Sequence, residues 1–328
     1  MDHSNQAVLE RLSQLVEQVQ QLRASDAPDQ DLISAHQAVI NDTTRELNHL
    51  VEGLITHQKL EEAYEMLTCM LLQLKTLYGT SCIRLVPVLS NMGKVCRLLQ
   101  NYPDSLTYYR QALEIETKEV GGESEEVAWT LNHIGNVLQE QEQWEEAQEY
   151  YLRSLALKEK HYGNTSTHVA TTLNNIASIY QRQEKFSDAL NCFERALQIL
   201  RHASSSTTHP AAQLRVHTSG VSGLSHQRGE PTVHAIALVL NNMGSVEHAL
   251  GHLDQALEYF RESLSVKENA FGPDSVEVSN TLFNMANVLK QKKELAQAKE
   301  LYSRCLHIRE EKLGVDSPQS QEVCKALE

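Results

Sequence analysis

The sequence predicts an all-α protein, a right-handed solenoid of about six helix-turn-helix repeats that are each 42 residues long. Three observations support this prediction: paired segments carry apolar residues at helical spacing, the pattern recurs at a fixed period, and the composition disfavours β-structure. Among 328 residues there are only 7 Pro and 14 Gly, and aromatic residues make up 5%. Strands bounded by frequent Gly and Pro turns are therefore not expected. Fixed self-similarity of this kind is typical of a solenoid, in which each repeat buries its apolar face only against its neighbours.

The repeat that shows the pattern most clearly runs from Val169 to Leu200. Each of its two segments carries an apolar stripe at helical spacing, and a short polar stretch separates them. The first stripe is Leu173, Ile176, Ala177 and Tyr180, and the second is Ala189, Phe193, Ala196 and Leu197. Two amphipathic helices joined by a polar turn are the expected structure.

Six repeats align in four columns: a leucine, a small residue, a large residue four positions later, and a closing glycine. The leucines are Leu47, Leu89, Leu131, Leu173, Leu240 and Leu282; the small residues are Ala63, Ser105, Ala147, Ala189, Ala256 and Ala298; the large residues are Leu67, Tyr109, Tyr151, Phe193, Phe260 and Tyr302; the glycines are Gly79, Gly121, Gly163, Gly272 and Gly314. A small residue lets two helices approach closely, and the large side chain fills the space beside it.

The column positions divide the chain into five parts. Residues 1–45 precede the first repeat, residues 46–200 hold repeats one to four, residues 201–233 form an insert, residues 234–314 hold repeats five and six, and residues 315–328 should form a capping helix. The insert follows from the step between Leu173 and Leu240, which is 67 residues instead of 42. It is rich in Ser, Thr, His and Gly and has no helical periodicity, so a flexible loop is expected.

The segment before the first repeat contains a short coiled-coil-like pattern. Val8, Leu12, Leu15, Val19 and Leu22 are separated by steps of 4, 3, 4 and 3, which is an a/d spacing. The pattern covers about two heptads, fewer than the three or four that identify a coiled coil. Two interpretations stay open: a helix that folds back and caps the first repeat, or a short coiled coil that binds a partner.

Charge and composition restrict the functional classes. The net charge is −14 and the isoelectric point is near 5.5, which argues against nucleic-acid binding because that function needs a basic surface. No apolar run approaches the roughly 20 residues of a membrane span. The N-terminus reads MDHSNQ, without the basic and apolar regions of a secretory signal. A cytoplasmic location without membrane insertion is the resulting expectation.

No catalytic, cofactor or metal pattern stands out in the sequence. Phosphate-binding GxxxxGK[ST], metalloprotease HExxH and hydrolase GxSxG patterns do not occur, and six cysteines form no CxxC pair. Cys96 and Cys305 fall at core positions of their repeats. His248 and His252 are four residues apart, but Gly251 should end the helix between them, and no third ligand is near. The sequence predicts a protein that is not an enzyme and has no cofactor or metal.

A polar column recurs two residues after the leucine column. It contains His49, Asn91, His133, Asn175, Asn242 and Asn284. Asparagine is unfavourable inside a helix, so its recurrence suggests a role on the inner wall of the solenoid. One interpretation is that these amides pair with the backbone of an extended peptide, since an amide carries both donors and an acceptor. The other is that they bond neighbouring helices and hold the pitch of the array.

Basic residues follow further along the same helices. Lys94, Arg97, Arg182 and Lys290 should face the same groove, interrupted by Glu140. A mildly basic groove in an acidic protein would favour an acidic peptide, although charges of this kind are also common on solvated faces. The candidate peptide-binding residues are Asn91, Lys94, Arg97, His133, Asn175, Arg182, Asn242, Asn284 and Lys290.

The repeats resemble a known family. The small–large alternation is the tetratricopeptide pattern, whose usual period is about 34 residues. The stretches TLNNIASIYQRQEKFSDALNCFERALQI and VLNNMGSVEHALGHLDQALEYFRESLSVKE resemble the 42-residue tetratricopeptide repeats of kinesin light chains, and the resemblance covers residues 46–328. That family also has an irregular insert late in its array; here the repeats restart at Pro231-Thr232-Val233.

The resemblance implies a protein–protein interaction adaptor. In kinesin light chains the groove binds short acidic cargo peptides and an N-terminal coiled coil binds kinesin heavy chain, so the implied partners are acidic motifs and kinesin heavy chain, with a cytoskeletal association. Asn175 and Asn242 match groove asparagines of the family. The long heptad region of the family is reduced here to residues 8–22. The alternative is a non-motor scaffold of the same repeat class in signalling or ciliary assembly.

Overall fold

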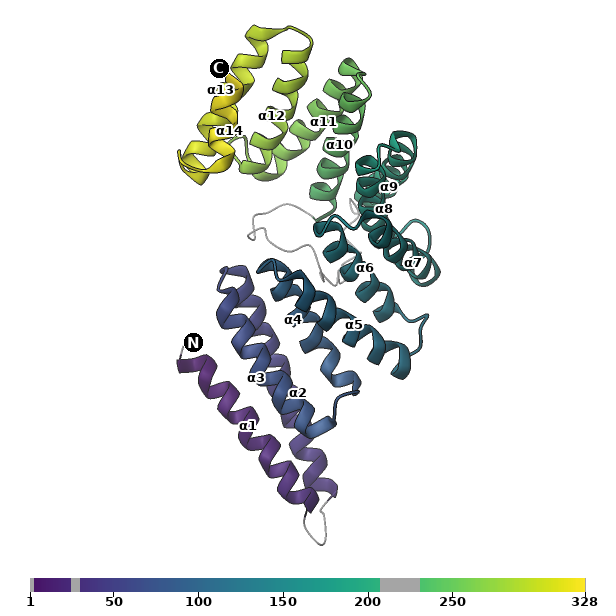
Figure 1. The fold of residues 1–328 in the computed structure, drawn as a ribbon, viewed down its shortest axis with the longest axis vertical. Coiled ribbons are helices and arrows are strands. Elements are labelled where there is room, and N and C mark those ends of the chain that lie inside the picture. The colour runs from purple at the N-terminus through teal and green to yellow at the C-terminus, as the bar shows by residue number, and fades with distance from the viewer. Residues whose placement is uncertain (1–2, 25–29, 207–230, 328) are drawn as a thin grey trace. The chain divides into compact units, whose positions relative to one another are not determined.

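The computed structural model describes residues 3–24, 30–206 and 231–327 (Figure 1). Within these ranges the chain forms 14 α-helices and one short 3₁₀ helix, η1 (Ile83–Leu85), and no strand. The predicted all-α repeat architecture is therefore confirmed. The chain divides into two compact units. The N-terminal unit holds the described residues up to Leu157, and the C-terminal unit holds those from Lys158 onward.

The N-terminal unit contains repeats one and two and most of repeat three. Its helices are α1 (His3–Ala24), α2 (Gln30–Thr56), α3 (Leu60–Tyr78), α4 (Val86–Leu98), α5 (Tyr102–Glu119), α6 (Glu125–Glu140) and the greater part of α7 (Trp144–Tyr162). The expected boundary between residues 45 and 46 falls inside α2, which is one continuous helix of 27 residues. Periodicity marked the start of the repeat but not the start of the helix, which extends N-terminally to pack against α1.

Helix α1 packs in this structure against α2 and α3 of its own chain. Leu9, Leu12, Val16 and Val19 are buried, with Leu12 and Val19 fully inaccessible. Arg23 donates a hydrogen bond to the carbonyl of Leu77 at the end of α3, at 3.0 Å. The arrangement is the one that the capping interpretation describes, because the apolar stripe is covered within the chain.

The C-terminal unit contains repeats four, five and six. Its complete helices are α8 (Thr167–Arg182), α9 (Phe186–Ser206), α10 (Pro231–Ala249), α11 (Leu253–Phe271), α12 (Val276–Gln291), α13 (Leu295–Leu313) and α14 (Pro318–Leu327). Helix α9 continues six residues into the expected insert, and α10 begins at Pro231, so both ends of that segment are helical. Residues 207–230, the rest of the expected insert, lie outside the described residues. Helix α14 packs on α13 with Val323 buried.

Close helix approach occurs inside each repeat at the small and large columns. A Cβ added to Gly135 or Gly244 would lie 2.7 Å from the ring of Tyr151 or Phe260, respectively, so only glycine fits there without a shift. In repeat two, the Ser105 hydroxyl of the small column donates to the Gly93 carbonyl of the partner helix at 2.7 Å. All members of the small and large columns are buried. The packing reason inferred from the sequence therefore holds in the structure.

The turn between the two helices of a repeat has one recurrent backbone conformation. One residue of each turn adopts positive φ: Gln58, Gln100, Glu142, Glu184, Gly251 and Lys293. Five of the six are not glycine and have φ between 58° and 64°, in the left-handed region that L-residues rarely adopt. The shared geometry fixes how the second helix of each repeat leaves the first.

Candidate peptide-binding face

Asparagine side chains join the first helices of neighbouring repeats. In the N-terminal unit the Asn91 amide donates to Asn48 Oδ1 at 3.1 Å, which joins α4 to α2. In the C-terminal unit the amide of Asn242 donates to Asn174 Oδ1 at 3.1 Å. The amide of Asn284 donates to Asn241 Oδ1 at 3.2 Å. These three pairs are called the asparagine ladder below. They are the interhelical bonds that the second interpretation of the polar column anticipates.

The ladder leaves part of each donor side chain available. A side-chain amide has two N–H donors and one carbonyl acceptor, and the ladder uses one donor of Asn91, Asn242 and Asn284. Within the described residues, these three side chains make no other hydrogen bond. Each is half-buried. One N–H and one oxygen per residue can therefore still meet a ligand without breaking the ladder.

The acceptors of the ladder form a column that sequence reasoning missed. Asn48, Asn174 and Asn241 directly follow the leucine column, and Asn132 occupies the same position in repeat three. Four asparagines in six repeats were as strong a signal as the column that was noticed. Periodicity alone did not show that a residue of one column meets a residue of the other column in the next repeat.

The remaining members of the polar column differ in their surroundings. The imidazole of His133 stacks on the ring of Tyr109, with ring centroids 5.3 Å apart and an angle of 12° between the planes. Asn175 is half-buried on α8. The His49 side chain is largely exposed and lies 3.9 Å from the Glu52 carboxylate. The column is therefore not uniform along the array.

Several of the basic candidates have partners within the chain. Arg97 forms an ion pair with Glu140, the residue expected to interrupt the basic face. Burial lowers the pKa of Lys94, the nearby Glu52 carboxylate opposes that shift, and Arg97 adds to it. Lys290 donates to the Ala326 carbonyl near the end of α14 at 2.8 Å. Arg182 is exposed at the end of α8.

A second feature that the sequence analysis missed is a buried column at the junction between repeats, with an ionisable residue in four of the six repeats. Leu74, Glu116, Lys158, Leu200, Lys267 and Arg309 occupy one equivalent position on the second helices, and all six are buried. The Lys158 ammonium donates to Thr172 Oγ1 at 2.9 Å, and the Lys267 ammonium donates to Thr281 Oγ1 at 2.7 Å. This set is called the seam column below. The recurrent threonine before the leucine column, as at Thr130, Thr172 and Thr281, was its sequence signal.

The histidines and cysteines that were considered as ligands do not converge. His248 Nε2 lies 2.6 Å from Gln291 Oε1, whereas His252 Nδ1 lies 2.7 Å from Glu247 Oε2, so the two rings have separate partners. Cys96 and Cys305 are buried, and all six cysteines are free. Across the described ranges, no three His, Cys, Asp or Glu side chains are grouped so that they could hold a metal ion. Among the helices of these ranges, none is both long and apolar enough to cross a membrane.

A family model described as tetratricopeptide repeat matches residues 84–160, 126–202 and 235–311, more than half of the chain. The chain belongs to the tetratricopeptide repeat family. The matched ranges cover repeats two to six of this tetratricopeptide protein, and α1 and α14 lie outside them. No curated protein matches its sequence.

Several solved structures share the fold at low sequence identity. BtubC (BKLC) from P. vanneervenii is 18% identical, with a TM-score of 0.58 over 80% of this chain and 92% of that one. A putative kinesin light chain from Podosopora anserina with nearly identical TPR-like repeats is 14% identical, with a TM-score of 0.52 over 70% and 96%. NprR in complex with its cognate peptide NprX is 17% identical, with a TM-score of 0.55 over 98% and 81%. Likeness at this identity shows the fold alone.

Proposed function

We propose that this tetratricopeptide protein is a non-catalytic adaptor that binds extended peptide segments along the ladder-bearing face of each unit. The observation that best supports this proposal is that Asn91, Asn242 and Asn284 each keep one N–H and one carbonyl oxygen available for a ligand after the ladder bond is formed. An extended peptide presents backbone C=O and N–H groups, which such amides can pair with simultaneously. Because the ladder bond fixes the side-chain orientation, little rotamer entropy remains to be lost on binding.

The finer proposal is a cargo adaptor similar to kinesin light chains. It is supported by the repeat length, by the sequence resemblance and by the likeness to a putative kinesin light chain. The partners would be an acidic peptide motif and kinesin heavy chain, in the cytoplasm and associated with the cytoskeleton. The further residues proposed to line these faces are Lys94, Arg97 and His133 in the N-terminal unit and Asn175, Arg182 and Lys290 in the C-terminal unit. Arg182 contributes most to steering an acidic peptide, because its side chain is exposed.

A non-motor scaffold is the second candidate, and the packing of α1 favours it. Of the predicted a/d stripe, Leu12 and Val19 are buried, and Val8, Leu15 and Leu22 pack partly buried against the same core, so the stripe that would form a coiled coil with a motor chain is occupied. Capture of purified kinesin heavy chain by the full chain would support the motor adaptor. Failure of capture at micromolar concentration, with the fold intact, would favour the scaffold.

The peptide proposal is tested by separating the two uses of one ladder pair. A peptide is selected from an acidic-peptide library against the full chain and titrated by calorimetry against Asn242→Ala and Asn174→Ala. Asn242→Ala removes the groups offered to the peptide, at about 0.5–1.5 kcal/mol per hydrogen bond, so affinity should fall about tenfold. Asn174→Ala removes only the ladder acceptor and leaves the Asn242 amide, so affinity should change less than about threefold.

Both variants should lose similar stability, since each breaks the same ladder bond. Circular dichroism confirms that they remain folded. If the two substitutions weaken binding equally, or if neither does, the amides are structural and the peptide-binding proposal for this face is wrong. Arg182→Glu tests the contribution of charge. The association rate of the acidic peptide should fall, and its dependence on salt concentration should become weaker, because exposed charge acts mainly on the rate of encounter.

A further inference from the structure

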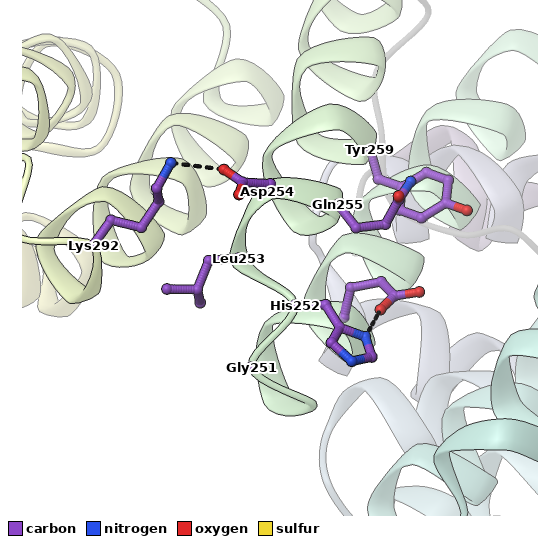
Figure 2. A pocket seen from close by; sticks show the side chains of 8 residues that line it. Gly251, His252, Leu253, Asp254, Gln255, Tyr259 and Lys292 are labelled. Carbon is purple, nitrogen blue, oxygen red and sulfur yellow. Dashed lines mark hydrogen bonds and ion pairs between the residues drawn. The ribbon is translucent and has the colours of Figure 1, made fainter.

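A recess lies at the turn between α10 and α11 of repeat five (Figure 2). Its volume is about 790 Å³, and its lining residues are Glu247, Gly251, His252, Leu253, Asp254, Gln255, Tyr259 and Lys292. Figure 2 shows Gln255 and Tyr259 on the same side as His252, with Asp254 and Lys292 on the opposite side. The recess is separate from the asparagine ladder, whose residues do not line it.

The carboxylate of Glu247 stands in a column that is otherwise apolar. The equivalent residues of the other repeats are Leu54, Cys96, Leu138, Tyr180 and Leu289. Glu247 is only 9% exposed, although an ionised carboxylate is costly to remove from water. Leucine at this position packs into the core in three repeats, so nothing in the repeat architecture requires an acid here. The substitution therefore indicates a local role in repeat five.

The two turn residues beside Glu247 also differ from the other repeats. Gly251 takes the positive-φ position that Gln, Glu or Lys occupies in the other five turns. A Cβ built on Gly251 meets no atom within 4 Å, so the missing side chain leaves open space. His252 is the residue before α11, and its side chain makes no capping bond to that helix. Glycine opens the recess, and the imidazole turns to Glu247 instead of to the helix.

Only one of the two carboxylate oxygens of Glu247 has a hydrogen-bond partner among the described residues. His252 Nδ1 lies 2.7 Å from its Oε2, and the side chain of His252 is 65% exposed. Among the described residues, no donor reaches the other carboxylate oxygen, Oε1. Glu247 lines the recess and its side chain is 11% exposed, so Oε1 is an acceptor that has no partner among the described residues and is open to the recess. A buried carboxylate of this kind gains most from a charged donor.

The surroundings favour a cation and disfavour an anion. Burial raises the pKa of the Tyr259 hydroxyl, the carboxylates of Glu247, Glu194 and Glu262 raise it further, and Arg201 opposes part of that shift. Asp254 lies at the opposite wall, where it pairs with Lys292 at 2.7 Å. Although the N-terminus of α11 opens toward this region, the negative potential felt by Tyr259 opposes an anion there. The Tyr259 ring adds an aromatic face of the kind that cations approach.

We propose that the recess at the α10–α11 turn binds a cationic side chain, an arginine or a lysine, of a partner protein. The guanidinium or ammonium would donate to Glu247 Oε1 and lie near Tyr259, with His252 at the entrance. This site would act in addition to the ladder face and would recognise the opposite charge. The proposal does not depend on peptide binding at the ladder.

The test uses the full chain and a minimal cationic probe. N-acetyl-arginine methylamide is titrated into the ¹⁵N-labelled protein, and the neutral isostere N-acetyl-citrulline methylamide serves as the ligand control. Arginine probe shifts should cluster at the amides of Gly251, His252 and Gln255 and saturate at millimolar concentration. The citrulline analogue should produce at least tenfold weaker shifts. Glu247→Gln should weaken binding of the arginine probe by at least tenfold.

Two further variants separate binding from folding. Gly251→Gln installs the side chain that repeats one and two carry at this backbone position, so it should block the recess and leave the helical signal unchanged. Glu300→Gln on α13 makes the same charge change at an exposed site and should leave binding unchanged. Glu247→Leu restores the residue of the apolar column if Glu247→Gln does not fold. Equal binding of the two probes, or unchanged binding in folded Glu247 variants, would overturn the proposal.

Discussion

Glu116 in the N-terminal unit and Lys267 in the C-terminal unit occupy the same position of the seam column with opposite charges. Glu116 is 2% exposed and faces Thr130 of the next repeat, and Lys267 is 7% exposed and faces Thr281, the equivalent residue. The two side chains therefore stand at equivalent positions of their repeats, and each hydrogen-bonds with the hydroxyl of the equivalent threonine in the next repeat. What differs is how each unit tolerates a buried ionisable group.

The Glu116 seam tolerates its buried carboxyl group because the group is more readily protonated there than in water. Burial raises the pKa of Glu116 to about 7, the hydrogen bond with Thr130 opposes that shift, and Glu126 adds to it. Glu116 Oε2 has no hydrogen-bond partner within the described residues. A protonated carboxyl at this position costs less than a carboxylate would, because the neutral form needs less compensation.

The Lys267 seam keeps its charge by connecting it to a polar network. Burial lowers the pKa of Lys267 to about 8, and Glu277 opposes that shift. Thr281 and Asn284 both donate to Asn241 Oδ1, so the ammonium, the threonine and the asparagine ladder are connected. The comparison teaches that the column accepts either charge where a hydroxyl of the next repeat is in reach, and that the local polar groups decide how that charge is tolerated; Leu74 and Leu200 show that it also accepts an apolar residue.

Arg309 shows the most completely satisfied form of the same position. Its guanidinium donates to the carbonyl of Gln319, to Glu322 and to Asn280 Oδ1, at 2.8, 3.2 and 3.1 Å. Its carbon lies 5.0 Å from the ring centre of Phe283. At the column position that faces α14, several acceptors therefore surround the buried guanidinium.

The largest expected effect comes from exchanging the charge at the better-connected seam. Lys267→Glu would place a carboxylate near Glu277 and should cost about 3–5 kcal/mol, the usual penalty of an uncompensated buried charge. Lys267→Met, which keeps the length without the charge, is the matched control and should be near neutral. Urea unfolding followed by circular dichroism measures both. Equal stabilities of the two variants would show that charge at this seam is irrelevant.

The two threonines should respond differently to the loss of their hydroxyls. Thr281→Val removes the acceptor of a mostly charged ammonium and should cost about 1–3 kcal/mol at pH 7. Thr130→Val should cost less at pH 6, because Glu116 is then mainly protonated. The valine is isosteric in both seams, so packing is matched. A larger loss for Thr130→Val at pH 6 would contradict the account of how each seam tolerates its group.

The pH dependence of stability should have opposite slopes for the two seams. The folded pKa of Glu116 is raised from 4.5 to about 7, so its contribution is full below pH 4.5 and is lost as the pH rises toward 7. The folded pKa of Lys267 is lowered from 10.5 to about 8, so the folded chain loses its proton first. Stability from this group therefore increases between pH 8 and 10.5.

Glu116→Gln should remove the loss of stability that occurs as the pH rises from 4.5 to 7. Lys267→Met should reduce the gain of stability between pH 8 and 10.5 and leave the part that Lys158 contributes, because burial lowers the pKa of Lys158 to about 7. Trp129 and Trp144 both belong to the N-terminal unit, so tryptophan fluorescence reports the transition in which Glu116 takes part. Circular dichroism follows both units. Retention of the wild-type slope in either variant would show that another group titrates in that window.

The smallest expected effect concerns Asn284, which connects the Lys267 seam to the ladder. Asn284→Ala removes one hydrogen bond to Asn241 and should cost about 0.5–1.5 kcal/mol. It should also move the pKa of Lys267, as followed by the ¹⁵Nζ resonance, because Asn241 becomes free to reorient. An unchanged resonance would separate the seam from the ladder.

The sequence by itself determined the repeat class and the core of this protein. The residues of the leucine, small and large columns are buried, as their spacing indicated, and Ala189 and Phe193 are fully inaccessible. The period also located the insert between repeats four and five. These features could be predicted because helical periodicity records directly which face of each helix avoids water.

Only the tertiary structure decided which residues meet across the repeats. The bond from Asn242 to Asn174, the contact of Lys267 with Thr281 and the cover of α1 by α2 and α3 join residues that are far apart in sequence. The recess at Glu247 was likewise not predicted. Glu247 stands out as the one carboxylate in a column of apolar residues only once the structure shows that this column is buried. Periodicity specifies the direction of a side chain, whereas its partner depends on the relative placement of two helices, which packing alone sets.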